Sequence, residues 1–292
     1  MRRKRKYILG LAFAAAVGVV IAGLGLAADK LPATVSFPHI WLGDIDQAKL
    51  PEPSGLCYHP GRGTLFAVGD EGHVLELTTN GVPVKMKHMG KIDFEGITVD
   101  PASGLLYIAW EGADRIVEFD PETFTFGPTF VLPRTFEGRT IMAPGGNGIE
   151  AITFIPSSNS VHGGTFIVAN QVFELGLTND LSALVEFEVP LRAPPGTNVP
   201  VQVLRVIEPG IIDLSGLHYD AKSGHIFVIS DTANMLLELT RAGVPVHAWA
   251  FPGKDQEGLA IDAEGYVYTA QDSGGITKRK YTGPDASSTS KE

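Results

Sequence analysis

Short hydrophobic runs separated by polar turns recur in one order along this chain. An apolar strand ends at an Asp or Pro turn, and a Gly then opens a second strand rich in β-branched and aromatic residues. That strand stops at a polar residue, and a third, alternating strand follows. Five segments keep this order, and they begin at Ser54, Glu95, Glu150, Ser215 and Glu257. No segment after residue 28 sustains a helical period, which excludes a helical solenoid.

A fourth strand is predicted between repeats, for example at residues 82–86 and 244–249. Four strands in a period of roughly 40 residues is typical of a β-propeller blade. The fifth repeat ends after residues 276–281 without a fourth strand, while residues 33–42 form one spare strand ahead of the first repeat. If these two pair, the ring closes and no sheet edge is left bare. We therefore predict an all-β, five-bladed β-propeller over residues 32–281.

Extra sequence between the middle repeats leaves a six-bladed propeller as the alternative. The insertions at residues 134–148 and 190–200 are rich in Pro and Gly, which favours loops over a further blade. The polar residues 282–292 are expected to form a disordered tail.

The N-terminus carries an export signal. Five basic residues among the first six precede an uncharged stretch that ends at Ala28 and is long enough to cross a bilayer. Residues 1–28 are therefore either a retained signal anchor, which we favour, or a cleaved signal peptide. The basic cluster would stay in the cytoplasm, so we expect a single-pass protein of the inner membrane whose C-terminal domain is exported to the periplasm or exterior.

The exported part is acidic. Removing residues 1–28 leaves 18 basic against 33 acidic residues, a net charge near −15. Such a surface repels nucleic acid and attracts cations, so nucleic acid is excluded as a partner. The single cysteine, Cys57, has no partner for an internal disulfide and lies in an apolar strand, which predicts a buried structural thiol.

Two repeat positions bring acidic residues together. The first residue of each repeat begins the innermost strand of a blade, near one mouth of the central channel. The residue that ends the second strand comes 16 positions later in three repeats and 15 positions later in the fifth, at Asp70, Glu111, Asp231 and Asp272. In the third repeat an insertion places Gln171 there, beside Asn170. An antiparallel pair returns the chain to its starting level, so the two positions of each repeat should lie side by side.

The result is a ring of carboxylates at one end of the axis. Carboxylates that close repel one another unless they are protonated, hydrated or neutralised by a cation. Oxygen ligands without a nearby thiol favour Ca²⁺, with Mg²⁺ second. The predicted metal ligands are Glu95, Glu150, Glu257, Glu111, Asp70, Asp231 and Asp272. In the alternative, structural interpretation these polar residues hydrogen-bond neighbouring blades, and the Gly that follows lets the inner strands approach closely.

Other catalytic signals are absent from the sequence. The eight histidines show no zinc-binding spacing, and neither a nucleophile elbow nor a phosphate loop is present. His218 lies on an innermost strand, where a general base is conceivable but a core or channel histidine is the more common case.

The repeat starts carry a family resemblance. The segments Pro53-Ser-Gly, Asp93-Phe-Glu-Gly-Ile, Asn147-Gly-Ile-Glu, Leu214-Ser-Gly-Leu and Asp255-Gln-Glu-Gly-Leu resemble the SdiA-regulated family. These bacterial envelope proteins have an N-terminal membrane segment and a propeller distantly similar to NHL repeats. The resemblance covers residues 32–281 and implies a five-bladed propeller with an axial calcium site. By position Glu95, Glu150 and Glu257 are its best ligand candidates, and Gln171 departs from the acidic pattern.

Two functions remain open at this point. In the first, the protein is a non-enzymatic envelope module that binds a small molecule, a glycan or a protein around a calcium-rigidified channel. In the second, it is a metal-dependent hydrolase of a lactone or phosphoester, in which the axial carboxylates hold a cation that activates water.

Overall fold

The computed structural model describes residues 31–142, 148–170, 182–193 and 199–283. Three predictions lie outside these ranges: the signal anchor or peptide at residues 1–28, the ligand position Gln171, and most of the disordered tail. No helix among the described residues has the length and apolar character needed to cross a membrane.

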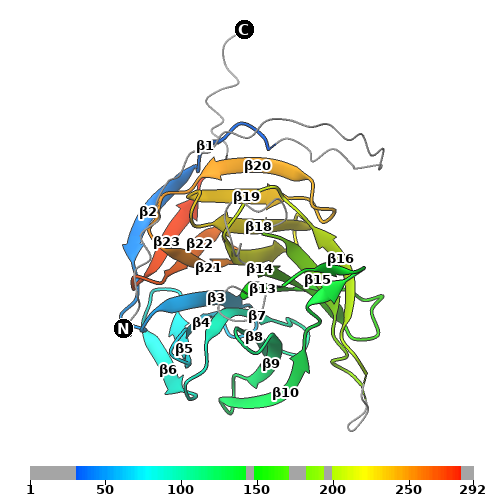
Figure 1. Ribbon diagram of the computed structural model, residues 1–292. Helices are drawn as coiled ribbons and strands as arrows, with labels where there is room; N and C mark the ends of the chain where they lie inside the picture. The colour runs from blue at the N-terminus through cyan, green and yellow to red at the C-terminus, as the bar shows by residue number, and fades with distance from the viewer. Residues whose placement is uncertain (1–30, 143–147, 171–181, 194–198, 284–292) are drawn as a thin grey trace, which may run out of the picture.

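Five sheets, antiparallel except for the pairing of one short N-terminal strand, surround one axis, so the chain folds as the predicted five-bladed β-propeller (Figure 1). The first blade contains β3 (Pro53–His59), β4 (Thr64–Gly69), β5 (His73–Thr78) and β6 (Pro83–His88). The second contains β7 (Phe94–Val99), β8 (Leu106–Trp110), β9 (Arg115–Asp120) and β10 (Thr125–Val131). The third contains β13 (Ile149–Pro156), β14 (Gly164–Asn170), β15 (Leu184–Glu188) and β16 (Gln202–Ile207).

The last two blades also use strands from the N-terminal part of the chain. The fourth contains β17 (Leu214–Asp220), β18 (His225–Ser230), β19 (Met235–Leu239) and β20 (Pro245–Ala250), with β1 (Val35–Ser36) parallel to β20. The fifth contains β21 (Gln256–Ile261), β22 (Tyr266–Gln271), β23 (Ile276–Tyr281) and β2 (His39–Asp44).

Ring closure follows the prediction, with one refinement. The spare strand does supply the outer strand of the fifth blade, because β2 pairs antiparallel with β23. The predicted strand at 33–42 is divided, however: its first part is β1 on the fourth blade, and its second part is β2 on the fifth. The N-terminal segment therefore ties the last two blades together.

The inserted segment after the second blade is not a sixth blade. In its described part it forms a short hairpin of β11 (Thr135–Phe136) and β12 (Arg139–Thr140). The loop prediction for this insertion was wrong in that detail alone, since two residue pairs form a ladder there.

Side chains on the second strand of a blade fill two different interblade cores. Along β4, Leu65 and Ala67 pack against the fifth blade, whereas Phe66 and Val68 pack against the second. Because successive residues of a strand point to opposite faces and both faces are covered, these strands are hydrophobic at nearly every position.

The innermost strands approach closely around the axis. A Cβ added at Gly96 would lie 2.8 Å from the backbone nitrogen of Ile152, and one added at Gly55 would lie 2.7 Å from the Cα of Gly96. A side chain is sterically excluded at such contacts. The glycine after the first residue of the repeat thus has the structural role that the sequence suggested.

Candidate metal centre

The first residue of every repeat lies in a β-bulge. The pairing of β3 with β4 skips from Pro53 to Gly55 and leaves Ser54 between them. The same irregularity encloses Glu95, Glu150, Ser215 and Glu257 in the other four blades. A bulge inserts an unpaired residue and redirects its side chain. In all five blades, therefore, the bulge directs the side chain of the first repeat residue out of the regular ladder, at the same end of the propeller.

The end of each second strand returns to this level, as predicted. The backbone N–H of Asp70 donates to the carbonyl of Glu52 at 3.3 Å, and that of Glu111 donates to the carbonyl of Asp93 at 3.0 Å. The fourth and fifth blades repeat the bond at 3.1 and 2.9 Å, from Asp231 to Asp213 and from Asp272 to Asp255. Each predicted acid therefore lies beside a second one, two positions ahead of the first residue of the repeat.

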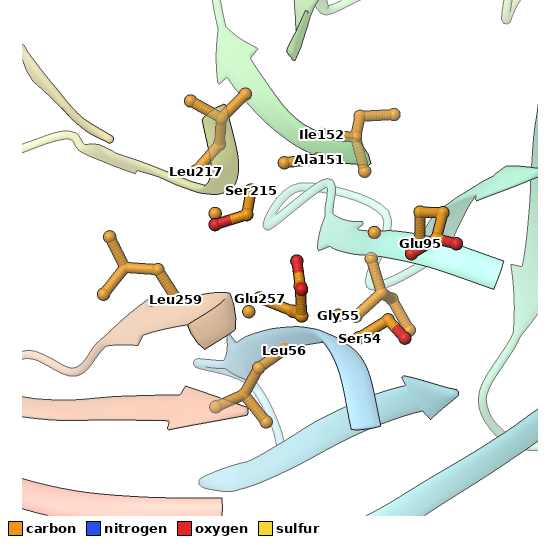
Figure 2. Close-up of a pocket in the computed structure, with 14 residues that line it drawn as sticks. Ser54, Gly55, Leu56, Glu95, Ala151, Ile152, Ser215, Leu217, Glu257 and Leu259 are labelled. Carbon is orange, nitrogen blue, oxygen red and sulfur yellow. The ribbon is translucent and has the colours of Figure 1, made fainter. Parts of the chain in front are cut away.

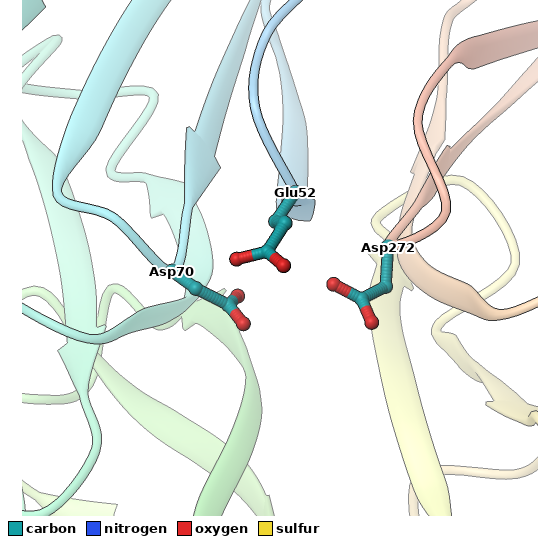
Figure 3. A group of neighbouring side chains, drawn as sticks. All are labelled: Glu52, Asp70 and Asp272. Carbon is teal, nitrogen blue, oxygen red and sulfur yellow. The ribbon is translucent and has the colours of Figure 1, made fainter. Parts of the chain in front are cut away.

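These neighbours complete two overlapping acidic clusters. Carboxylate oxygens of Glu52, Asp70 and Asp272 lie within 4.8 Å of one another, and so do those of Asp70, Asp93 and Glu95. Figure 3 shows the three carboxylates of the first cluster turned toward one another. Asp70 belongs to both clusters. We call these five residues the acidic mouth; it spans the junctions of the first blade with the fifth and the second.

Glu52 and Asp93 were missed by the sequence analysis, although the repeat contains the signal. The position two residues before the repeat start is acidic in four repeats and Gly148 in the third. Glu52, Asp213 and Asp255 also share a left-handed backbone, with φ of 41°, 58° and 50°. A repeat position that keeps both its acidity and an uncommon conformation is a structural feature of the blade start.

Two predicted ligands are directed to the next blade. Glu111 accepts a hydrogen bond from the backbone N–H of Gly148 at 2.9 Å, and Asp231 accepts one from that of Gln256 at 2.7 Å. Ser215 bridges the same junction as Asp231, because its hydroxyl donates to the carbonyl of Gln256 at 2.6 Å. The predicted ring is thus uneven: the two acidic clusters lie around the first blade. At two other junctions a carboxylate bonds the backbone of the next blade, and Glu111 also shares a hydrogen bond with the carboxyl of Glu150.

Burial raises the pKa of the carboxyls on the axis. It is the main cause for Glu95, Glu150 and Glu257, whose pKa values are all raised well above the usual range, and neighbouring acids add to it. Burial also raises the pKa of Glu111 to about 7, with the charge of Asp93 adding to the effect. Without a cation, this end of the propeller therefore retains protons that free carboxylic acids release.

The space on the axis beside Glu95 and Glu257 is small. Its volume is about 10 Å³, near the room that one water molecule needs, and the starts of all five inner strands line it. Ser54, Glu95, Ser215 and Glu257 lie around it (Figure 2). One small ion or water fits here, and an organic substrate does not.

The donors of the acidic mouth fit a hard cation. All of its side-chain donors are carboxylate oxygens, the ligands that Ca²⁺ takes in numbers of six to eight together with backbone carbonyls and water. Zinc is not favoured, because the two acidic clusters contain neither histidine nor cysteine. Of the predicted ligands, Asp70, Glu95 and Asp272 belong to these clusters, whereas Glu111, Glu150, Asp231 and Glu257 do not. The ligand role of all seven stays a prediction.

Two other residues noted in the sequence are placed at the opposite end of the channel. Burial lowers the pKa of His218 to about 4, so its imidazole is neutral at physiological pH. Cys57 is 8% exposed, and burial raises the pKa of its thiol. Both border a cavity of about 230 Å³ at that end. A buried thiol with a raised pKa is a poor nucleophile, as the sequence predicted.

Two family models match parts of the chain. One is described as SdiA-regulated and matches residues 202–273; the other, Phytase-like, is described as esterase-like activity of phytase and matches residues 49–180. A search of curated proteins finds no match.

Two solved structures resemble the chain. The crystal structure of Myxococcus xanthus glutaminyl cyclase is 14% identical, covers 85% of this chain and 98% of its own, and gives a TM-score of 0.59. A nidogen/laminin complex, also 14% identical, covers 75% of this chain and 72% of its own with a TM-score of 0.47. At such identities the first likeness supports the propeller fold alone.

Proposed function

We propose that this chain, a β-propeller whose residues 202–273 resemble the SdiA-regulated family, binds a divalent cation at the acidic mouth and acts as a binding module of the cell envelope. The observation that carries the proposal is the pair of acidic clusters that share Asp70. Ca²⁺ is the preferred ion and Mg²⁺ the second choice, because Mg²⁺ demands stricter octahedral geometry and retains its water.

The electrostatics of the site support a resident cation. The acidic mouth brings five carboxyls together, and one of them, Glu95, is also one of the buried carboxyls on the axis. A cation would favour the ionised forms and offset their mutual repulsion. By binding carboxylates at the junctions of the first blade with the fifth and the second, the cation would also hold these blades together.

The envelope location is part of the proposal. Its support is the sequence of residues 1–28, with a basic cluster ahead of a long uncharged stretch. A retained anchor would hold the propeller at the inner membrane and present it outside the cytoplasm. There its acidic surface would bind a small molecule, a glycan or a protein.

A metal-dependent hydrolase is the second candidate. It is favoured by the phytase-like match over residues 49–180, a range that includes every residue of the acidic mouth except Asp272. A bound divalent cation would supply Lewis-acid activation of water. Among the protein's own groups, Glu111 has a pKa of about 7 and is therefore suited to exchange a proton near neutral pH. The expected substrates are lactones and phosphoesters.

Thermal unfolding of the full-length protein with Ca²⁺, with Mg²⁺ and with EDTA tests the cation site. A free Ca²⁺ concentration 100-fold above Kd should raise the unfolding free energy by about 2.7 kcal/mol and thus raise Tm. Asp70→Asn should abolish this shift, because Asp70 belongs to both clusters. The control Glu264→Gln changes an exposed acid in the β21–β22 turn and should keep the shift.

A further pair of variants locates the ion. If Asp70→Asn removes the Ca²⁺ shift and Glu257→Gln retains it, the ion lies at the acidic mouth; the reverse result would place it on the axis. No shift with either cation would contradict the proposal. Hydrolysis of p-nitrophenyl phosphate and of a simple lactone, with Ca²⁺ and with EDTA, tests the second candidate. Equal rates for the wild type and Asp70→Asn would reject the hydrolase and leave cation binding intact.

A further inference from the structure

A large cavity lies between the fourth and fifth blades, at the opposite end of the inner strands from the acidic mouth. Its volume is about 690 Å³, within the range of pockets that bind small organic molecules. The turns after β17 and β21 border it, and these turns are the far ends of the strands that begin near Ser215 and Glu257. A ligand here would not contact the proposed cation site.

Aromatic rings form one wall of this cavity. Phe37 lies 5.6 Å from Trp249 and 5.3 Å from Tyr281 between ring centroids, and Phe227 is stacked parallel to Trp249 at 6.5 Å. These rings come from the N-terminal segment, from β18, β20 and β23, and all four line the cavity. Such a wall suits a flat or apolar body and the face of a cation.

The first blade shows why the space is open here. Phe66 occupies the repeat position of Phe227, three residues after the glycine that opens the second strand. Phe66 is fully buried, and Phe124 from the second blade packs against it at 6.4 Å. Phe227 is only partly buried, and no described aromatic residue of the fifth blade fills the corresponding place against it. The face of Phe227 is therefore left available to the cavity.

One carboxylate lies in this apolar wall. Glu238 belongs to a repeat position on the third strand that is glutamate in four blades; we call Glu76, Glu118, Glu186 and Glu238 the third-strand glutamates. Glu76 is held by Arg62 at 2.8 Å, and Glu186 by Arg205 at 2.7 Å and by Arg241. Glu118 accepts a bond from the hydroxyl of Tyr107 at 3.2 Å.

Glu238 differs from the rest in its partners and in its surroundings. Each of its carboxylate oxygens bonds one imidazole, that of His225 at 2.6 Å and that of His247 at 2.7 Å. No arginine or lysine forms a described ion pair with it. It is also the one third-strand glutamate that lines the cavity. A carboxylate without a permanent cation beside aromatic faces is the recognition element for a positively charged group.

The remaining charged groups of the lining do not change this conclusion. Asp220 is engaged by Ser223 and by the backbone N–H of Lys222, while Asp262 is engaged by the hydroxyl of Tyr268. The Lys222 side chain is the single permanent cation among the described lining residues. With three acids against one base, the cavity carries a net negative charge.

We propose that this cavity binds a small organic cation, an amine or quaternary ammonium compound with an aromatic or aliphatic body. The charged group contacts Glu238, and the body lies against Trp249 and Phe227. Nothing in this assignment depends on the cation site, so the two functions are independent.

Three probes with one body and different charge test the proposal on the full-length protein: 2-phenylethylamine, 2-phenylethanol and 3-phenylpropionate. Titration calorimetry, with tryptophan fluorescence as a second readout, should give binding of the amine at least about tenfold tighter than of the alcohol and weakest for the carboxylate. Equal binding of amine and alcohol, or preference for the carboxylate, would overturn the proposal, as would binding of none.

Two variants and one control connect the binding to this cavity. Glu238→Gln should remove the preference for the amine, whereas Glu118→Gln, a change at the matching position of the second blade, should retain it. Ala263→Trp fills the exposed rim without altering the aromatic wall and should abolish binding of all three probes. Unchanged Tm values show that each variant is folded. Undiminished amine binding in both Glu238→Gln and Ala263→Trp would place the amine elsewhere and refute the assignment.

Discussion

The acidic mouth and the third-strand glutamates are both carboxylates repeated around one propeller, but they differ in what faces them. In each of the two clusters of the acidic mouth, carboxylates from two adjacent blades lie within 4.8 Å of one another. On the third strands, each glutamate faces its own partner, an arginine pair at Glu186 and two histidines at Glu238. The first arrangement favours a cation from outside the chain, and the second mostly provides its counter-charge within the chain.

This difference shows that repetition alone does not indicate a site. The glutamate that recurs in four blades has a structural role wherever an arginine forms an ion pair with it, as at Glu76 and Glu186. The glutamate becomes a recognition element where histidines take the place of the arginine and a cavity lies beside it, as at Glu238. The chemistry is decided by the residues across the blade junction, which lie far away in sequence.

The largest loss of stability is expected from a substitution at the closely packed inner strands that carry the axial carboxyls. Gly96→Ala should lower the unfolding free energy by about 3 kcal/mol or more, because the new Cβ would meet backbone atoms of Ala151 and Ile152 at 2.8–3.1 Å. Chemical denaturation measures this loss. Gly61→Ala is the matched control: its Cβ would meet only the His59 ring, at 3.4 Å, and the change should be nearly neutral.

The comparison also gives a pH prediction for the axial carboxyls. In EDTA, Glu111 has a folded-state pKa of about 7 against an ordinary 4.5, so the folded protein retains a proton that the unfolded chain has released. Its contribution to stability is therefore complete below pH 4.5 and is lost as the pH rises through 7, a decline of about 3 kcal/mol. His218 acts oppositely, since its pKa of about 4 makes stability rise between pH 4 and 6.5.

A difference measurement separates the two groups. Glu111→Gln preserves an acceptor for the Gly148 N–H and leaves His218 unchanged. The stability of wild type minus that of Glu111→Gln, measured by denaturation from pH 5 to 8, should fall steadily with rising pH. A flat difference would mean that Glu111 ionises normally in the folded protein.

Much of the fold could be predicted because it follows from the local periodicity of hydrophobic and turn residues along the sequence. Alternation, turn residues and the missing fourth strand at residues 276–281 led to five blades and to closure by the N-terminal segment. The division of that segment between β1 and β2 was missed, because the parallel pairing of β1 with β20 depends on the position of a distant blade. The β11–β12 hairpin was missed because two residue pairs give no periodic signal.

The candidate site could be predicted only within each repeat. The pairing of Ser54 with Asp70 follows from strand length, and the structure contains their hydrogen bond. What Glu111 or Asp272 meets across a blade junction depends on how the blades are set around the axis. The sequence therefore predicted an even ring, whereas the structure concentrates the acids around the first blade. Glu52 and Asp93 could have been found in the sequence, because both stand two positions before the first residue of their repeat, a position that the alignment of the repeats left out.

The smallest and most discriminating effect compares two third-strand glutamates directly. Glu186→Gln removes the charge that Arg205 and Arg241 share, and it should cost about 2 kcal/mol of unfolding free energy, as charged hydrogen bonds are worth. Glu238→Gln should cost less than about 1 kcal/mol, because a neutral amide can both accept from one imidazole and donate to the other. Denaturation of the two variants in one buffer measures the difference. If Glu238→Gln costs as much as Glu186→Gln, the histidines act as fixed cations, and the carboxylate is as fully neutralised as its arginine-bound counterpart.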